Sequence, residues 1–281
     1  MQNFTVIGSS GFIGHALAEA LTGHSGAAVR RVDRQQIGHL SGPSSGEDFG
    51  HVFYCIGLTA NFRTRPFDTV QAHVCVLREF LEKARFETFT YLSSTRVYEG
   101  ANGTTESASL RVSPSDPGHL YNLSKLMGES LCHARGANAK VVRLSNVYGA
   151  AMPPKNFLSQ VLQKSRESGK VQFLTAPSSS KDYVSIDDVV RWLPMIATQG
   201  KHSVYNVATG RNTSNAHIGK LLQQRGVDVS FSADAPEWSF PVIDTRRLNE
   251  AFGPPSSSLP EDFDLLCSRR ETMQPASHKH A

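Results

Sequence analysis

The sequence predicts an α/β fold in which a doubly wound parallel sheet carries helices on both faces and a smaller C-terminal lobe follows. Over the first 150 residues, apolar runs of strand length alternate with stretches of helical periodicity, as they do where crossover helices join parallel strands. A glycine-rich turn, Gly8-Ser-Ser-Gly11-Phe-Ile-Gly14, directly follows the first apolar run. Together these two observations indicate a sheet of the Rossmann type.

The expected elements follow in order along the chain. Five apolar runs have the length of buried strands: Phe4–Ile7, Val29–Val32, Val52–Ile56, Phe89–Leu92 and Val141–Leu144. Helical spacing follows the first run, at Ile13, Leu17 and Leu21, and the third, at Val70, Val74, Leu77 and Leu81. The residues between Asp33 and Val52 include several glycines and Pro43, so we expect a loop there in place of one strand or crossover helix.

The second part of the chain, from about Ala150, has irregular spacing and more proline and serine. Ser185-Ile-Asp-Asp188 has the pattern of a capping box that begins a helix, and Ser203–Val207 has the pattern of a strand. We therefore predict a dinucleotide-binding domain over residues 1–150, with returning segments near 181–207. Residues 151–281 are expected to form mostly a discontinuous substrate-binding lobe, with a disordered tail after about residue 268.

Composition narrows the class of protein. The formal net charge of +4 is mild and no basic stripe is present, which argues against a nucleic-acid partner. The four cysteines are widely spaced and lack metal-binding patterns, so we expect reduced thiols and no metal site. No apolar run approaches the roughly 20 residues of a membrane span, and the first strand begins too near Met1 for a signal peptide. These observations predict a cytoplasmic protein with no membrane partner.

The glycine turn has the features of a dinucleotide-binding loop. Gly8 permits a sharp turn, Gly11 lets the chain approach a pyrophosphate, and Gly14 lets the following helix pack on the strand. The N-terminus of that helix would direct free N–H groups at the anion. A glycine triplet alone is weak evidence, since an ordinary turn has the same composition. The strand before it, the helix after it and Asp33 downstream favour a bound cofactor.

Asp33 bears on which cofactor is bound. Its carboxylate, 19 residues after Gly14, can accept hydrogen bonds from the adenosine ribose and would repel a 2′-phosphate, which favours NAD over NADP. Arg31 and Arg34 leave NADP open as the alternative, because a guanidinium can hold a 2′-phosphate. Gly57 is a further candidate for close approach to the cofactor, with a plain turn glycine as the alternative.

Tyr121 and Lys125 are the strongest candidates for chemistry. Residues four apart share a face of a helix, so both side chains point into one space. A nearby ammonium, together with a positively charged nicotinamide ring, would lower the pKa of a tyrosine from about 10 and make it a proton acceptor. Ser94, which follows Phe89–Leu92, would hydrogen-bond the same substrate oxygen, with Ser93 as its alternative. The predicted reaction is hydride transfer at a carbinol or keto carbon.

These motifs resemble those of the extended short-chain dehydrogenase/reductases, in particular the sugar-nucleotide epimerase/dehydratase family. The resemblance runs through nearly the whole chain and is carried by the glycine turn, by Tyr121-Asn-Leu-Ser-Lys125, and by Ile56–Ala60, Ser93–Tyr98, Arg143–Gly149, Lys181–Asp188 and Tyr205–Gly210. In this family the catalytic serine or threonine stands four residues before the tyrosine of the serine segment, which selects Ser94.

The motifs and the resemblance together assign the site residues. The expected cofactor-binding residues are Gly8, Gly11, Phe12, Ile13, Gly14, Asp33, Arg34, Gly57, Tyr121 and Lys125. The resemblance implies that the substrate is bound by Ser94, Thr95, Asn146 and Lys181.

Three departures from the family pattern shape the predicted activity. Thr95-Arg96 stands where sugar dehydratases carry an Asp-Glu pair, so the acid and base for 4,6-dehydration are missing. His73 stands where an asparagine is usual. Lys181 replaces the usual arginine, so that a single ammonium charge stands in place of a planar guanidinium with paired hydrogen-bond donors. We therefore predict an NAD(P)-dependent epimerase or 4-ketoreductase that acts on a nucleotide-sugar, and not a 4,6-dehydratase.

Two other functions stay open at this point. One is an NAD(P)-dependent dehydrogenase or reductase of a non-nucleotide alcohol or ketone, in which Asn146 and Lys181 would be structural. The other is a non-catalytic NAD(P)-binding sensor or scaffold, since a fold alone does not establish catalysis. Such a protein would have no reason to retain Ser94, Tyr121 and Lys125 together. A small-molecule ligand is expected in each case, and a homodimer is compatible with the sequence.

Overall fold

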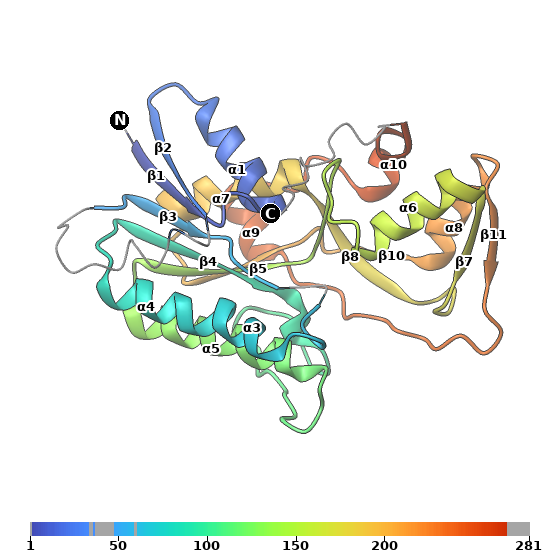
Figure 1. Ribbon diagram of the computed structural model, residues 1–281, viewed down its shortest axis with the longest axis horizontal. Helices are drawn as coiled ribbons and strands as arrows, with labels where there is room; N and C mark the ends of the chain where they lie inside the picture. The colour runs from blue at the N-terminus through green and yellow to red at the C-terminus, as the bar shows by residue number, and fades with distance from the viewer. Residues whose placement is uncertain (1, 34–35, 37–47, 59–60, 269–281) are drawn as a thin grey trace, which may run out of the picture.

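A six-stranded parallel sheet forms the centre of the protein (Figure 1). The structure is a computed structural model that describes residues 2–33, 36, 48–58 and 61–268. The strand order is β2-β1-β3-β4-β5-β9, so the chain reverses direction across the sheet between β1 and β3. The strands are β1 (Gln2–Ile7), β2 (Ala27–Val32), β3 (His51–Tyr54), β4 (Thr88–Ser94), β5 (Ala139–Leu144) and β9 (Val204–Val207).

Helices cover both faces of this sheet, as Figure 1 shows. One face carries α1 (Phe12–Thr22), α7 (Ile186–Gln199) and α9 (Arg246–Phe252). The other face carries α3 (Pro66–Val70), the π-helical turn η2 (Gln71–Cys75), α4 (Val76–Lys83) and α5 (His119–Arg135). Alternate residues of a strand supply the two cores: Phe53 packs with α1 and α7, whereas Val52 and Tyr54 pack with α4. The predicted doubly wound α/β fold is confirmed.

A second group of elements lies beyond the carboxyl ends of the strands. It contains a three-stranded sheet of β10 (Asn212–Ser214), β8 (Ser180–Ser185) and β6 (Asn146–Tyr148), and a two-stranded sheet of β11 (Asp228–Phe231) and β7 (Lys170–Phe173). Its helices are α6 (Phe157–Ser168), α8 (Asn215–Gln223) and α10 (Leu259–Ser268). These elements share a separate apolar core that includes Leu158, Phe173 and Phe263. The long segment after β11, orange in Figure 1, runs back to the central sheet.

Several local predictions can be compared with the structure. The capping box is confirmed, because Ser185 Oγ accepts a hydrogen bond from the Asp188 N–H at 3.1 Å where α7 begins. The sequence analysis missed α9 and α10, which lie in the irregular C-terminal part. The loop expected between Asp33 and Val52 falls mostly outside the described residues, as does the tail after residue 268. The domain boundaries stay a prediction.

Among the described residues, no helix combines the length and apolar character that crossing a membrane requires. The same part of the chain holds no cluster of three or more histidine, cysteine or acidic side chains arranged for a metal ion. All four cysteines are described and have free thiols.

Candidate active site

The glycine turn connects the end of β1 to the start of α1 and is shaped by contacts that leave no room for side chains. Gly8 has a φ of +85°, a left-handed conformation that favours glycine. A Cβ on Gly14 would lie 2.2 Å from Gly8 O, so this glycine lets α1 begin directly above the strand end. The Gly8 N–H donates to Val32 O at 2.7 Å, which ties the turn to β2. A backbone cradle of this kind fits a dinucleotide pyrophosphate at a helix N-terminus.

Asp33 directly follows β2 and lies beside this turn. Ser9 Oγ donates a hydrogen bond to Asp33 Oδ1 at 3.1 Å, and the Asp33 side chain is exposed. Arg31 is directed elsewhere, because its Nη2 pairs with Glu19 of α1 at 2.7 Å. Arg34 lies outside the described residues.

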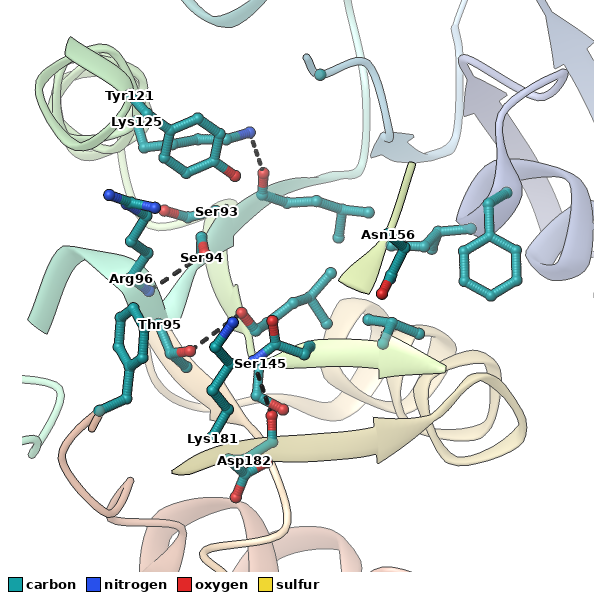
Figure 2. Close-up of a pocket in the computed structure, with 18 of the residues that line it drawn as sticks. Ser93, Ser94, Thr95, Arg96, Tyr121, Lys125, Ser145, Asn156, Lys181 and Asp182 are labelled. Atoms are coloured by element: carbon teal, nitrogen blue, oxygen red, sulfur yellow. Dashed lines mark hydrogen bonds between the residues drawn. The ribbon is translucent and has the colours of Figure 1, made fainter. Parts of the chain in front are cut away.

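A pocket of about 520 Å³ opens at the carboxyl ends of the central strands, between the sheet and the second group of elements. It brings together most of the predicted site residues: Gly11, Phe12, Ile13, Gly57, Ser94, Thr95, Tyr121, Lys125, Asn146 and Lys181. Figure 2 shows Tyr121 and Lys125 reaching in from α5, Ser94 from the end of β4, and Lys181 from β8 on the opposite side. Gly8, Gly14 and Asp33 do not line this pocket.

Tyr121 is buried and hydrogen-bonds Ser94. Burial raises the pKa of the phenol, and the bond to Ser94 and the charge of Arg96 only partly oppose this. Lys125 Nζ lies 5.9 Å from the centroid of the Tyr121 ring and donates to Leu92 O at 2.8 Å, so it makes no hydrogen bond to the phenol. The lowering of this pKa by Lys125 together with a positive nicotinamide ring stays a prediction.

Lys125 lines the pocket but is only 4 % exposed. Burial lowers the pKa of its ammonium to about 7, although the negative charge of Glu129 works in the opposite direction. A Cβ on Gly57 would lie 3.5 Å from Lys125 Nζ, so the glycine leaves the ammonium open to the loop after β3. At neutral pH this group can therefore both hold and release a proton.

Ser93, the alternative to Ser94, is held by a hydrogen bond within the core of the protein. Its Oγ donates to Glu129 Oε1 at 2.5 Å, and Glu129 also accepts a hydrogen bond from Arg143 Nη2 at 2.7 Å. All three side chains are buried, and the pair of charges ties α5 to β4 and β5. This engagement leaves Ser94, which bonds Tyr121, as the serine available to a substrate.

His73 was noted in the sequence only as a departure from the family, and it lies at the centre of a hydrogen-bond chain. Its Nε2 accepts from the Leu58 N–H at 3.1 Å, so its Nδ1 carries the proton and donates to Ser124 Oγ at 2.8 Å. Ser124 Oγ in turn donates to Tyr121 O at 2.9 Å. Burial, followed by the charge of Lys125, lowers the pKa of His73 to about 2. The ring is therefore neutral.

The opposite wall of the pocket is formed by the second group of elements. Lys181 Nζ lies 4.9 Å from the centroid of Phe157 and has no carboxylate partner among the described residues. Asn146 Nδ2 donates to Asp182 O at 2.9 Å, which holds β6 to β8. Asn156 caps α6 by accepting from the Leu158 N–H, so that this helix begins at the pocket.

Sequence reasoning did not assign a site role to Arg96, Asn156 or Trp238, which also line the pocket. Asn156 could have been found as an N-cap before the apolar pair Phe157-Leu158. Trp238 lies in the irregular segment after β11, where no periodic pattern points to a neighbour.

The fold and this pocket define a dinucleotide-binding protein with a Tyr–Lys pair and a serine at the strand ends. The chain belongs to the NAD dependent epimerase/dehydratase family, whose model matches residues 4–208. The prediction of NAD as the cofactor agrees with this family, and the resemblance stated above is confirmed.

Individual relatives are more distant. A dTDP-glucose 4,6-dehydratase of Streptomyces griseus is 28% identical over 147 residues, which cover 50% of this chain and 44% of that protein. The chain spans about half the length of the curated relatives it matches.

Solved structures show the same fold over nearly the whole chain. An NAD-dependent NDP-hexosamine 5,6-dehydratase, TunA, has a TM-score of 0.80 at 22% identity, covering 96% of this chain and 99% of its own. UDP-glucuronic acid 4-epimerase from Bacillus cereus, in complex with UDP-glucuronic acid and NAD, has a TM-score of 0.73 at 19% identity, covering 94% and 99%.

Proposed function

We propose that this protein is an NAD-dependent enzyme that transfers hydride at a carbinol or keto carbon of a nucleotide-sugar. The observation that carries the proposal is the convergence of Tyr121, Ser94 and Lys125 on one pocket wall, next to the glycine turn. A sensor or scaffold would need no phenol hydrogen-bonded to a serine at this position. The family supports a nucleotide-sugar as the substrate.

The cofactor would be held by the residues of the glycine turn, with Asp33 at its ribose. Gly11, Phe12 and Ile13 line the pocket and bring the backbone of the first turn of α1 to it. Gly57 keeps the loop after β3 open beside Lys125. When bound, NAD supplies the hydride acceptor or donor, and its positive ring adds to the charge that favours a phenolate.

The side chains then divide the proton chemistry. Ser94 donates a hydrogen bond to the substrate oxygen and holds it against the phenol. Tyr121 accepts the hydroxyl proton when the carbinol is oxidised and returns it when the ketone is reduced. Lys125, whose ammonium has a pKa of about 7, would add its positive charge to that of the bound cofactor and so favour the phenolate when it is protonated.

The acidic residues of the pocket bear on whether the enzyme could carry out 4,6-dehydration. Among the described residues that line it, Asp182 is the acidic one, and its carboxylate accepts from the N–H groups of Thr209 and Arg211, both at 3.0 Å. A 4,6-dehydratase needs an acid and a base at the sugar carbons, whereas this chain has Thr95 and Arg96 beside Ser94. We therefore favour an epimerase or a 4-ketoreductase.

The test has two readouts. Isothermal titration of the purified protein with UDP-, dTDP-, GDP- and CDP-sugars is expected to give binding with at least one of them. Cofactor that copurifies and stays bound through turnover would identify an epimerase, which returns the hydride to the same molecule. Cofactor exchanged in each turnover would identify a reductase. Absence of binding to all four sugar nucleotides would reject the proposed substrate class.

A further inference from the structure

Arg96 lies at the end of the pocket where the reaction is proposed to occur. Its backbone N–H donates to Ser94 Oγ at 3.2 Å at the start of the 3-10 turn η3 (Thr95–Tyr98). Its guanidinium carbon lies 5.4 Å from the centroid of Phe62, whose ring packs against Tyr121 with centroids 5.3 Å apart. The positive charge of Arg96 works to lower the pKa of the Tyr121 phenol, against the larger effect of burial, which raises it. Figure 2 shows Arg96 below Tyr121 and beside Ser94.

The surroundings of Arg96 carry an excess of positive charge. Glu99 pairs with its Nη2 at 3.3 Å, whereas its Nε is buried and has no hydrogen-bond partner among the described residues. The Nη2 atoms of Arg63 and Arg96 both lie within 4 Å of the position that a Cβ on Gly118 would take. Asp116 Oδ1 lies 3.0 Å from the same position. The charge of Arg96 also helps to lower the pKa of Lys181, so three cations, Arg63, Arg96 and Lys181, face this region against the two carboxylates of Glu99 and Asp116.

A partly buried cation with an unused donor favours an anionic partner, because an uncompensated charge away from water is costly. Lys181, on the far wall, is one of the predicted substrate-binding residues, and its ammonium suits the diphosphate of a nucleotide-sugar. A second anion is then needed near Ser94, where the reacting sugar carbon would lie. An exocyclic carboxylate on the neighbouring sugar carbon meets this need, and a guanidinium matches a carboxylate with paired hydrogen bonds.

We propose that the substrate is an acidic nucleotide-sugar, a uronate, and that Arg96 is the specificity residue that holds its carboxylate. This inference rests on the proposed function. It also accounts for an arginine at a position where sugar dehydratases of the family carry an acid. A carboxylate on that side chain would repel the carboxylate of a uronate, whereas Arg96 selects it.

The experiment measures binding with the NAD-saturated protein by isothermal titration. One ligand series is UDP, UDP-glucose and UDP-glucuronic acid, and the other is GDP, GDP-mannose and GDP-mannuronic acid. We expect the uronate of one series to bind about tenfold or more tightly than the neutral sugar, the effect of one charge-assisted contact. Arg96→Gln should remove this preference and leave the affinity for the nucleotide alone unchanged. Arg96→Lys should keep part of the preference for the uronate, because the positive charge remains although the paired donors of the guanidinium are lost.

Lys181→Gln is the matched control, since it should weaken the nucleotide, the neutral sugar and the uronate alike. NAD affinity reports whether each variant is folded. Equal affinity of the unsubstituted protein for uronate and neutral sugar would overturn the inference while the proposed function stands. Weaker binding of the nucleotide alone in Arg96→Gln would overturn it too, because Arg96 would then be a diphosphate contact. No binding of any ligand in either series would overturn this inference, whereas the proposed function would be overturned only if dTDP- and CDP-sugars also failed to bind.

Discussion

His73 Nδ1 and Ser124 Oγ lie 2.8 Å apart, and this hydrogen bond joins the π-helical turn η2 to the helix that carries Tyr121. At its other end the imidazole holds the Leu58 N–H, one residue after Gly57. One buried ring thus positions both Tyr121, the proposed acid–base residue, and the loop that would face the cofactor. The extra residue of a π turn is often found at functional sites, and here it places His73 between the two partners.

The first prediction concerns the acid stability of this arrangement. The pKa of His73 is about 2 in the folded protein and 6.5 in the reference state, so below pH 6.5 the unfolded chain binds more protons. Stability must therefore fall as pH falls through this window. Between pH 7 and pH 5, the unsubstituted protein should lose about 2 kcal/mol of unfolding free energy relative to His73→Gln. Urea unfolding at several pH values measures this difference.

The control for this measurement is His133→Gln. His133 is exposed near the end of α5 and takes no part in the hydrogen-bond chain. This variant should follow the pH profile of the unsubstituted protein. A profile of His73→Gln parallel to that of the unsubstituted protein would show that His73 is not held neutral in the folded state.

A second prediction tests the proposed acid–base role of Tyr121. Tyr121→Phe keeps the ring that packs on Phe62 and removes the hydroxyl that bonds Ser94. Turnover should fall by at least about 10²-fold, the contribution of a positioned acid–base group, while NAD affinity is retained. Tyr183→Phe is the matched control, because Tyr183 is buried in the second core and does not line the pocket. Near-normal turnover of Tyr121→Phe would contradict the assignment.

Much of the fold could be predicted from the sequence because most of its central strands, β3, β4, β5 and β9, are buried on both faces. Such strands appear as continuous apolar runs, and five of the six central strands were predicted in the first 150 residues. The sixth, β9, was expected from Ser203–Val207. The helices α9 and α10 were missed because they are short, and proline- and serine-rich segments surround them. Tertiary packing, rather than local pattern, fixes them: Phe252 of α9 packs against Tyr205, and α10 packs against α8 and β8.

The site could be predicted from the sequence only where a motif fixes the spacing between its residues. The interval from Tyr121 to Lys125 places both on one helix face, and the structure brings both to the pocket. The interval cannot show that Lys125 Nζ bonds Leu92 O rather than approaching the phenol, because that depends on where β4 lies. For the same reason the roles of Arg96 and Trp238 depend on contacts between distant segments.

A third prediction concerns the choice between NAD and NADP. Asp33→Ala removes the carboxylate beside the glycine turn, so it should weaken NAD more than NADP and reduce the preference about tenfold, the effect of one lost charge-assisted bond. Arg31→Gln is the control and should leave the preference unchanged, because Arg31 pairs with Glu19. Fluorescence titration of both cofactors measures the ratio. A preference of the unsubstituted protein for NADP would contradict this role of Asp33.

The last prediction is that Lys125 costs the protein stability. Its pKa is about 7 when folded and 10.5 in the reference state, so between these values the unfolded chain binds more protons. Stability therefore rises with pH across this window, and the full penalty applies below pH 7. From pH 7 to pH 9 the unsubstituted protein should gain about 2 kcal/mol relative to Lys125→Met.

At pH 7 Lys125→Met should equal or exceed the unsubstituted protein in stability, since the thioether fills the same buried space without a charge. Its turnover should nevertheless be lower, because the positive charge that would favour the phenolate of Tyr121 is lost. Urea unfolding of the cofactor-free protein measures the first effect. Lys83→Met, at an exposed position in α4, should change neither the pH profile nor the turnover. A Lys125→Met variant that is less stable at pH 7, with a pH profile parallel to that of the unsubstituted protein, would mean that Lys125 is charged and well stabilised in the fold.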